Sequence, residues 1–62
     1  MNAAQLRKIR KNLGWSQAQL AREVGVTTNS VARWERGEMA ISEPTARLIK
    51  RIADDPKVKP NG

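Results

Sequence analysis

The stretch QAQLAREVGVTTNSVARWERG, residues 17–37, decides the fold of this chain. Its apolar residues recur at the spacing of two short helices, and Gly25 stands between them, where a chain reversal favours a left-handed backbone. Ala21 is small enough to let two helices cross closely, and Val26 can fill the turn from the core side. We therefore predict two helices that are joined by a tight turn and cross at a steep angle.

Capping residues set the expected boundaries of both helices. Ser16 precedes the first helix, which is expected to end at Val24, and Ser16 with Gln19 has the spacing of a capping box. Thr27 is a suitable N-cap for the second helix, which is expected to end at Gly37.

Two more helices are predicted to flank this pair. One covers about residues 3–13, where Asn2 and Gln5 form another capping box. The other follows Ser42, with Pro44 in its first turn, where a missing N–H costs nothing. Its core face is expected to consist of Leu48, Ile49, Ile52 and Ala53.

The fold class is therefore predicted to be all-α, a compact bundle of four helices. Residues 1–54 are expected to form this single domain. Residues 55–62 contain Pro, Gly, Asn and charged residues and are expected to form a disordered tail.

Composition excludes several kinds of site. The chain has no Cys and no His, which rules out disulfides, zinc fingers and histidine general bases. None of its six acidic residues stands beside a nucleophile or in a metal-ligand pattern, so we predict no enzyme activity, no metal and no cofactor. No apolar run is long enough for a membrane span, and we expect a soluble, cytoplasmic protein.

The charge balance favours an anionic partner. Twelve Lys and Arg against six Asp and Glu give a net charge of +6. Nucleic acid, a membrane surface and an acidic protein all suit such an excess, and a solubilising surface suits it as well. Most basic residues of the two flanking helices are interpreted as solvated charge; these are Arg7, Lys8, Lys11, Arg47, Lys50 and Arg51.

The second helix of the central pair has two unlike sides. At about 100° per residue, Val31 and Trp34 face the core, while Asn29, Arg33 and Arg36 face away from it. This arrangement is typical of a helix-turn-helix motif, whose second helix enters the major groove of DNA.

Three residues on the outer side are candidates for reading bases. Asn29 can pair with adenine, Arg33 with guanine, and Thr28 can meet a base edge or a thymine methyl group. The alternative interpretation is that these are ordinary solvated side chains of a surface helix.

Four segments carry a resemblance to a known family. The chain is similar to the Cro/CI-type, or XRE-family, helix-turn-helix proteins, which include lambdoid phage repressors. The resemblance covers roughly residues 5–53. Its carriers are LRKIRK at 6–11, GWSQ at 14–17, LAREVGV at 20–26 and SVARWERG at 30–37.

This resemblance implies a lambda-repressor-like fold and a role for each matching residue. It implies that Gln17 and Arg36 contact DNA phosphates, with Thr27, Thr28, Asn29 and Arg33 along the side that faces the groove. Apart from the resemblance, we expect Thr27 to cap its helix and to reach a phosphate as well. It also implies that Arg10 pairs with Glu35 and ties the first helix to the third. A solvated side chain at Gln17 and an Arg36–Glu38 salt bridge are the alternatives.

The chain departs from the family after Asp54. Phage repressor domains usually have a fifth helix that helps to form the dimer, and residues 55–62 offer no apolar face for one. We still expect two copies to bind on an inverted repeat, as a homodimer at least on DNA.

The expected function is sequence-specific binding of double-stranded DNA by a small transcriptional repressor, which could control its own promoter. A bacterial or phage-encoded, nucleoid-associated protein fits this size. One alternative is an antitoxin-like module whose main partner is a toxin protein. Another is a basic module that binds nucleic acid by charge alone.

Overall fold

Each helix begins at a side chain that caps it. The computed structural model describes residues 1–55 and contains four helices and no strand within them, which confirms the all-α prediction. Asn2, Ser16, Thr27 and Ser42 each accept a hydrogen bond from the backbone N–H three residues further on. The helices are α1 (Ala3–Leu13), α2 (Gln17–Val24), α3 (Thr28–Glu35) and α4 (Glu43–Asp54).

The predicted capping boxes differ from each other. At α1, the Asn2 side chain accepts from the Gln5 N–H at 2.8 Å, and the Gln5 side chain accepts from the Asn2 N–H at 2.9 Å, so the box is complete. At α2, the Ser16 hydroxyl oxygen accepts the Gln19 backbone N–H at 3.1 Å. The Gln19 side-chain amide, however, donates to the Glu23 carboxylate at 3.0 Å. The prediction of a complete box at α2 was wrong, because an acceptor one turn along the helix competes for the same side chain.

The turn between α2 and α3 depends on a left-handed glycine. Gly25 has φ +85°, and a Cβ built on it would meet no atom within 4 Å. Its requirement for glycine therefore comes from the backbone conformation and not from crowding by neighbours. The Ala21 carbonyl accepts both the Gly25 and the Val26 N–H at 2.9 Å, which ties the turn to the last turn of α2.

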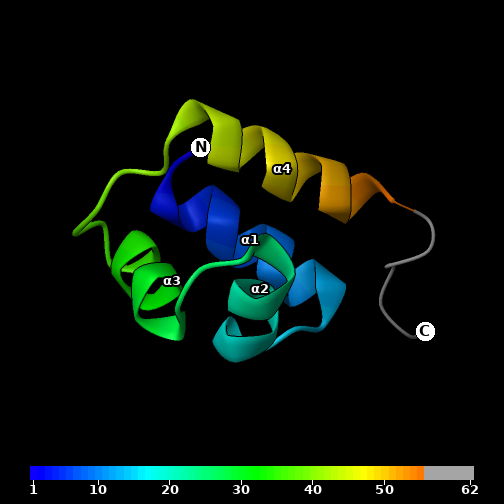
Figure 1. Cartoon of the computed structure of the whole chain (residues 1–62), viewed down its shortest axis with the longest axis horizontal. Coiled ribbons are helices and arrows are strands. Elements are labelled where there is room, and N and C mark those ends of the chain that lie inside the picture. Colours follow the sequence, from blue (N-terminus) through cyan, green and yellow to red (C-terminus); the bar gives the residue numbers. More distant parts are fainter. Residues whose placement is uncertain (56–62) are drawn as a thin grey trace.

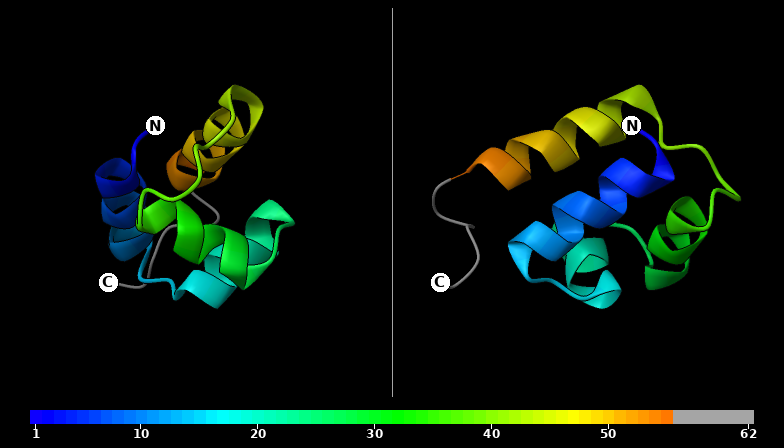
Figure 2. Two further views of the ribbon diagram at one scale, coloured as in Figure 1. Left: turned by 90° about the vertical axis from the view of Figure 1, so that its left-hand side faces the viewer. Right: turned by 180° about the vertical axis from the view of Figure 1, so that it is seen from behind.

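The four helices enclose one small core. Figures 1 and 2 show α4 along one edge of the molecule and α2 with α3 along the opposite edge. The most extensive packing between helices is that of α2 against α3. The core cluster takes residues from every helix and consists of Leu6, Leu20, Ala21, Val31, Trp34 and Ile49.

The core face of α4 differs from the prediction at one position. Leu48 was expected in the core but is 39% exposed, whereas Ala46 is buried beside Ile49. Leu48 is one residue from Ile49, which turns its side chain by about 100° away from the buried stripe. Ile52 and Ala53, the other predicted core residues, are half-buried.

Two further expectations concern the end of α3 and the C-terminal tail. The end of α3 lies at Glu35, and Gly37, with φ +75°, closes its C-terminal turn. The predicted tail, apart from Asp55, lies outside the described residues.

A larger side chain at Ala21 is expected to separate α2 from α3. Ala21 is 2% exposed, so Ala21→Leu should lower the free energy of unfolding by about 1–3 kcal/mol through overpacking. Ala18→Leu is the matched control, because Ala18 is exposed on the same helix and should change stability by less than about 0.5 kcal/mol. Urea unfolding of both variants measures the difference, and equal effects would contradict the close crossing.

Candidate nucleic-acid interface

The three residues predicted to read bases lie on the exposed side of α3. Thr28, Asn29 and Arg33 are all exposed, while Val31 and Trp34 on the opposite side are buried. At about 100° per residue, Asn29 and Arg33 lie one turn apart on the same side. The fold therefore presents them together to solvent, on a helix that lies along the edge of the molecule opposite α4 (Figure 1).

Thr27 is held by its capping role. Its hydroxyl oxygen accepts the Ser30 N–H at 3.2 Å and lies 3.1 Å from the Ser30 hydroxyl. The residue is exposed, so its surroundings leave room for a phosphate. The sequence analysis did not predict the contact between Thr27 and Ser30, although the place of Ser30 three residues after an N-cap threonine was a usable signal.

A buried carboxylate joins three helices behind the exposed side of α3. Glu35 is 6% exposed, and its two carboxylate oxygens accept from Arg10 Nε at 2.6 Å and from Arg10 Nη2 at 3.1 Å. Arg10 Nη1 also donates to the Trp15 carbonyl at 2.9 Å. The Arg10–Glu35 pair therefore exists as the resemblance implied, in a two-point geometry that fixes both side chains.

Gln17 also belongs to this cluster. Its side-chain amide donates to Glu35 Oε1 at 3.2 Å, which connects the start of α2 to the end of α3. The side chain that was predicted to meet a phosphate is thus engaged inside the protein. The backbone N–H of Gln17, in the first turn of α2, has no carbonyl within that helix to bond and can still point at a phosphate.

Arg7 has a structural contact that the sequence interpretation missed. It was interpreted as solvated charge, but its Nη2 donates to the backbone carbonyl of Glu35 at 2.7 Å. A cation there stabilises the negative end of the α3 dipole. The spacing from Arg7 to Arg10 puts both on one face of α1, and that spacing was the signal available in the sequence.

The cluster also determines the ionisation of Glu35. Burial alone would raise the pKa of its carboxyl. Hydrogen bonds from Arg10 and Gln17, with the charges of Arg10 and Arg7, outweigh burial and lower the pKa below its usual value. Glu35 is therefore ionised at neutral pH, as the paired geometry requires.

Arg36 is paired with Glu38 and not free. Arg36 Nε lies 2.6 Å from Glu38 Oε2, and Arg33 Nε lies 3.9 Å from Glu38 Oε1. The alternative interpretation of Arg36 as a partner of Glu38 therefore describes the protein without DNA. The hydrogen bond from Arg36 is the main cause that lowers the pKa of the Glu38 carboxyl.

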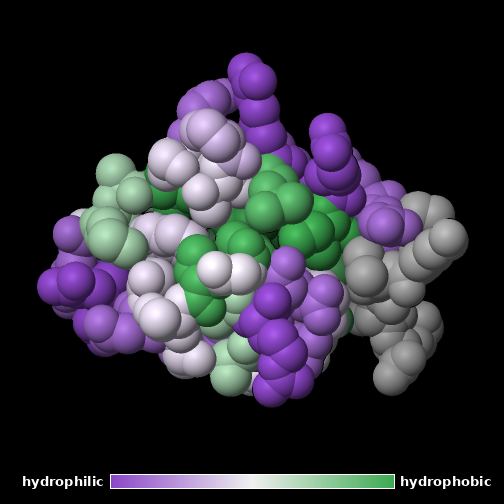
Figure 3. Space-filling view, viewed as in Figure 1, coloured by the Kyte–Doolittle hydropathy of each residue, from purple (hydrophilic) through white to green (hydrophobic). Residues whose placement is uncertain are grey.

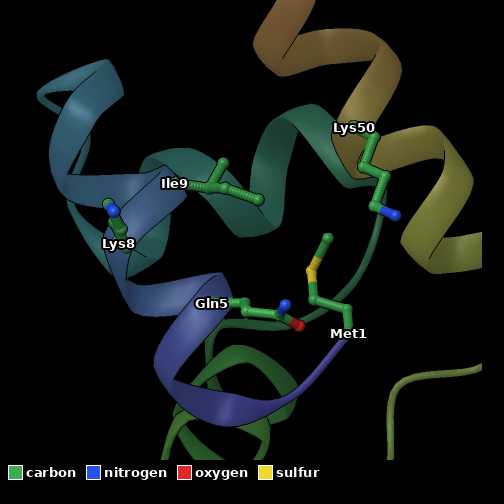
Figure 4. A pocket seen from close by; sticks show the side chains of 5 residues that line it. All are labelled: Met1, Gln5, Lys8, Ile9 and Lys50. Carbon is green, nitrogen blue, oxygen red and sulfur yellow. The ribbon is translucent and has the colours of Figure 1, made fainter.

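A shallow depression lies on another part of the surface. Figure 4 shows it between α1 and α4, with Met1 and Ile9 pointing toward it and Lys50 on its far side; Gln5 and Lys8 complete the lining. On the face seen in Figure 1, Figure 3 shows hydrophobic side chains gathered between α4 and α2, with hydrophilic ones around them. No residue of α3 lines this depression.

Residues 1–55 contain no group of three or more acidic, His or Cys side chains suited to a metal ion. None of the helices in that range combines the length and apolar character that crossing a membrane requires.

Comparison with known proteins identifies the family. A family model described as helix-turn-helix matches residues 6–62, most of the chain. The chain belongs to this helix-turn-helix family. The resemblance to XRE-family proteins is thereby confirmed.

Curated relatives of this helix-turn-helix chain occur in archaea. Proteins of Pyrococcus furiosus, Thermococcus kodakarensis and Pyrococcus horikoshii are 38%, 35% and 32% identical to it over 60 residues, or 97% of the chain. Their names describe them, provisionally, as HTH-type transcriptional regulatory proteins. The chain spans only 19% of their length. No solved structure matches it significantly.

Loss of Arg10 is expected to be costly because it leaves a buried carboxylate unpaired. Arg10→Met should lower the free energy of unfolding by about 3 kcal/mol. Arg47→Met is the matched control: Arg47 pairs with Glu43 at 3.5 Å, but both are more than three-quarters exposed, so the loss should be about 0.5 kcal/mol or less. Urea unfolding followed by tryptophan fluorescence compares them, and similar losses would show that the Arg10–Glu35 pair contributes little.

The lowered pKa of Glu35 predicts a pH dependence of stability. Its stabilising contribution should be complete above the unfolded-state pKa, near 4.5, and should be lost as pH falls through the lower folded-state pKa. Glu35→Gln should therefore lose less stability than the wild type between neutral pH and about pH 3. Equal pH profiles for Glu35→Gln and the wild type would contradict the role of Glu35.

Proposed function

We propose that this helix-turn-helix protein binds double-stranded DNA sequence-specifically and acts as a transcriptional regulator. The observation that carries the proposal is the exposed side of α3, where Thr28, Asn29 and Arg33 are open to solvent. The side-chain amide of Asn29 and the guanidinium group of Arg33 are both groups that recognise base edges in the major groove. The net charge of +6 supports binding to a polyanion.

The rigidity of α3 supports reading of sequence over binding by charge alone. An isolated helix of eight residues is not stable in water, so its position depends on its contacts with the other helices. The Arg10–Glu35 pair, Gln17 and Arg7 all hold its C-terminal end. A base-reading helix needs this fixed orientation, because its hydrogen bonds to bases are directional.

In the proposed complex, base and phosphate contacts come from different residues. Thr28, Asn29 and Arg33 read bases. Thr27, the backbone N–H of Gln17 and Arg36 contact phosphates, the last after leaving Glu38. Such phosphate contacts make affinity fall with salt, by about 0.9 in log affinity per log salt for each phosphate neutralised.

We further propose that two copies bind an inverted repeat and repress a promoter, which can be the protein's own. Half-sites about one helical turn apart would place two α3 helices on the same side of the duplex. Occupying a promoter is enough to block transcription sterically, so repression needs no further part of the protein. The alternative, an antitoxin-like module, predicts a toxin protein as the main partner and DNA binding as secondary.

Selection of bound sites from random duplex DNA tests the function. We expect a two-fold symmetric motif that contains guanine. Absence of any enriched motif would overturn sequence-specific binding and favour the charge-only or antitoxin-like alternatives.

Arg33→Ala tests the assigned base contact. It should weaken binding to the selected duplex by about 1–3 kcal/mol and relax the preference at one guanine. Arg51→Ala is the control, since Arg51 is an exposed arginine on α4, along the opposite edge. Fluorescence anisotropy measures the effect, with the selected duplex and with a duplex in which that guanine is replaced. Equal losses for Arg33→Ala and Arg51→Ala would contradict the base contact.

A further inference from the structure

Glu38 places a carboxylate between two arginines that the proposed function assigns to DNA. Arg36 makes a hydrogen-bonded pair with it, with Nε at 2.6 Å from Oε2 and Nη2 at 3.4 Å from Oε1. Arg33 Nε lies 3.9 Å from Oε1, an ion-pair distance. All three side chains are at least half exposed, so a ligand can reach the whole group.

The backbone fixes where Glu38 lies. Its N–H donates to the Arg33 carbonyl at 2.9 Å, and the N–H of Gly37 donates to the Trp34 carbonyl at 3.2 Å. These two bonds around a left-handed glycine form the Schellman motif that ends many helices. The position of Glu38 beside Arg33 and Arg36 is therefore built into the end of α3.

A carboxylate at this place is otherwise unfavourable. The C-terminal end of a helix carries partial negative charge and favours cations. A carboxylate next to a DNA-facing surface also repels phosphates. Within residues 1–55 the ion pairs of Glu38 are those with Arg33 and Arg36, which offset both effects. We therefore ask what the carboxylate does to these two arginines.

Carboxylate and phosphate are alternative partners for the same guanidinium group. Arg36 gives two of its N–H donors to Glu38, so a phosphate must compete with this carboxylate for the same guanidinium group. This competition weakens every complex held by charge. Arg33 contacts the same carboxylate through its Nε, at 3.9 Å, which leaves its Nη1–Nη2 edge for another partner. That edge can form the paired hydrogen bonds to guanine O6 and N7.

We propose that Glu38 is a specificity-determining residue of this surface, whose carboxylate orients Arg33 toward a base and withholds Arg36 from phosphates of arbitrary sequence. This inference rests on the proposed function. It assigns a role to a residue that contacts no base, because Glu38 raises the ratio of specific to non-specific DNA binding.

Glu38→Gln removes the charge and keeps the size of the side chain. Its affinity for a random-sequence duplex should rise about fivefold at low salt, with a salt dependence steeper by about 0.9, the value for one more phosphate. Its affinity for the selected duplex should change by less than about twofold, because the loss of Arg33 orientation offsets the gain in charge. The specificity ratio should therefore fall.

Glu43→Gln is the matched control. It removes the same charge from another exposed Arg–Glu pair, on α4, with Arg47 as the partner. It should leave the specificity ratio unchanged. If Glu38→Gln also leaves the ratio unchanged, Glu38 acts only through net charge and the inference is overturned.

A measurement without DNA tests the orientation directly. NMR relaxation of the Arg33 and Arg36 Nε–H groups should show higher mobility in Glu38→Gln than in the wild type. Unchanged mobility would overturn the orienting role. If the wild type prefers no sequence, the proposed function itself fails, and the mobility result then reports separately whether Glu38 holds the arginines.

Discussion

The buried carboxylate of Glu35 is the interaction on which the arrangement of helices depends. It accepts two hydrogen bonds from Arg10 on α1 and one from Gln17 on α2. The backbone carbonyl of the same residue accepts a hydrogen bond from Arg7. A carboxylate this far from water needs such partners, since an unpaired buried charge is strongly destabilising. The relative positions of α1, α2 and α3 that satisfy it are therefore narrowly defined.

That constraint matters because the helices are short. Eight residues in α2 and eight in α3 give little stability from local hydrogen bonds alone. The small core, in which Ala21 is buried, adds non-directional attraction. The directional bonds to Glu35 add a preferred orientation, and this orientation is what a helix needs to present Asn29 and Arg33 in one direction.

The two glutamates near the end of α3 have opposite surroundings. Glu35 is buried and connects helices, whereas Glu38 is half exposed and pairs with Arg36 beside the surface proposed to meet DNA. Two residues separate them in the sequence, and the C-terminal turn at Gly37 lies between them. The chain thus uses one carboxylate to hold the helix and places another where it can modulate what the helix binds.

Much of the fold was readable in the sequence. Helix starts followed from Asn2, Ser16, Thr27 and Ser42, because a capping side chain acts on the backbone only three residues away. The turn at Gly25 and the two sides of α3 followed equally from local conformation and periodicity. The Arg10–Glu35 pair came only through the resemblance to a family, since nothing local connects residues so far apart.

Other features depended on the tertiary structure. What decides them is which partner lies nearby in space. They are the exposure of Leu48, the hydrogen bond from Gln19 to Glu23, and the contacts of Arg7 and Gln17 with Glu35. Local sequence determines the helices, their caps and their apolar sides, because these involve neighbours a few residues apart. Only the packed structure decides which polar side chains are engaged inside the protein and which are left for a ligand, because distant segments compete for the same donors and acceptors.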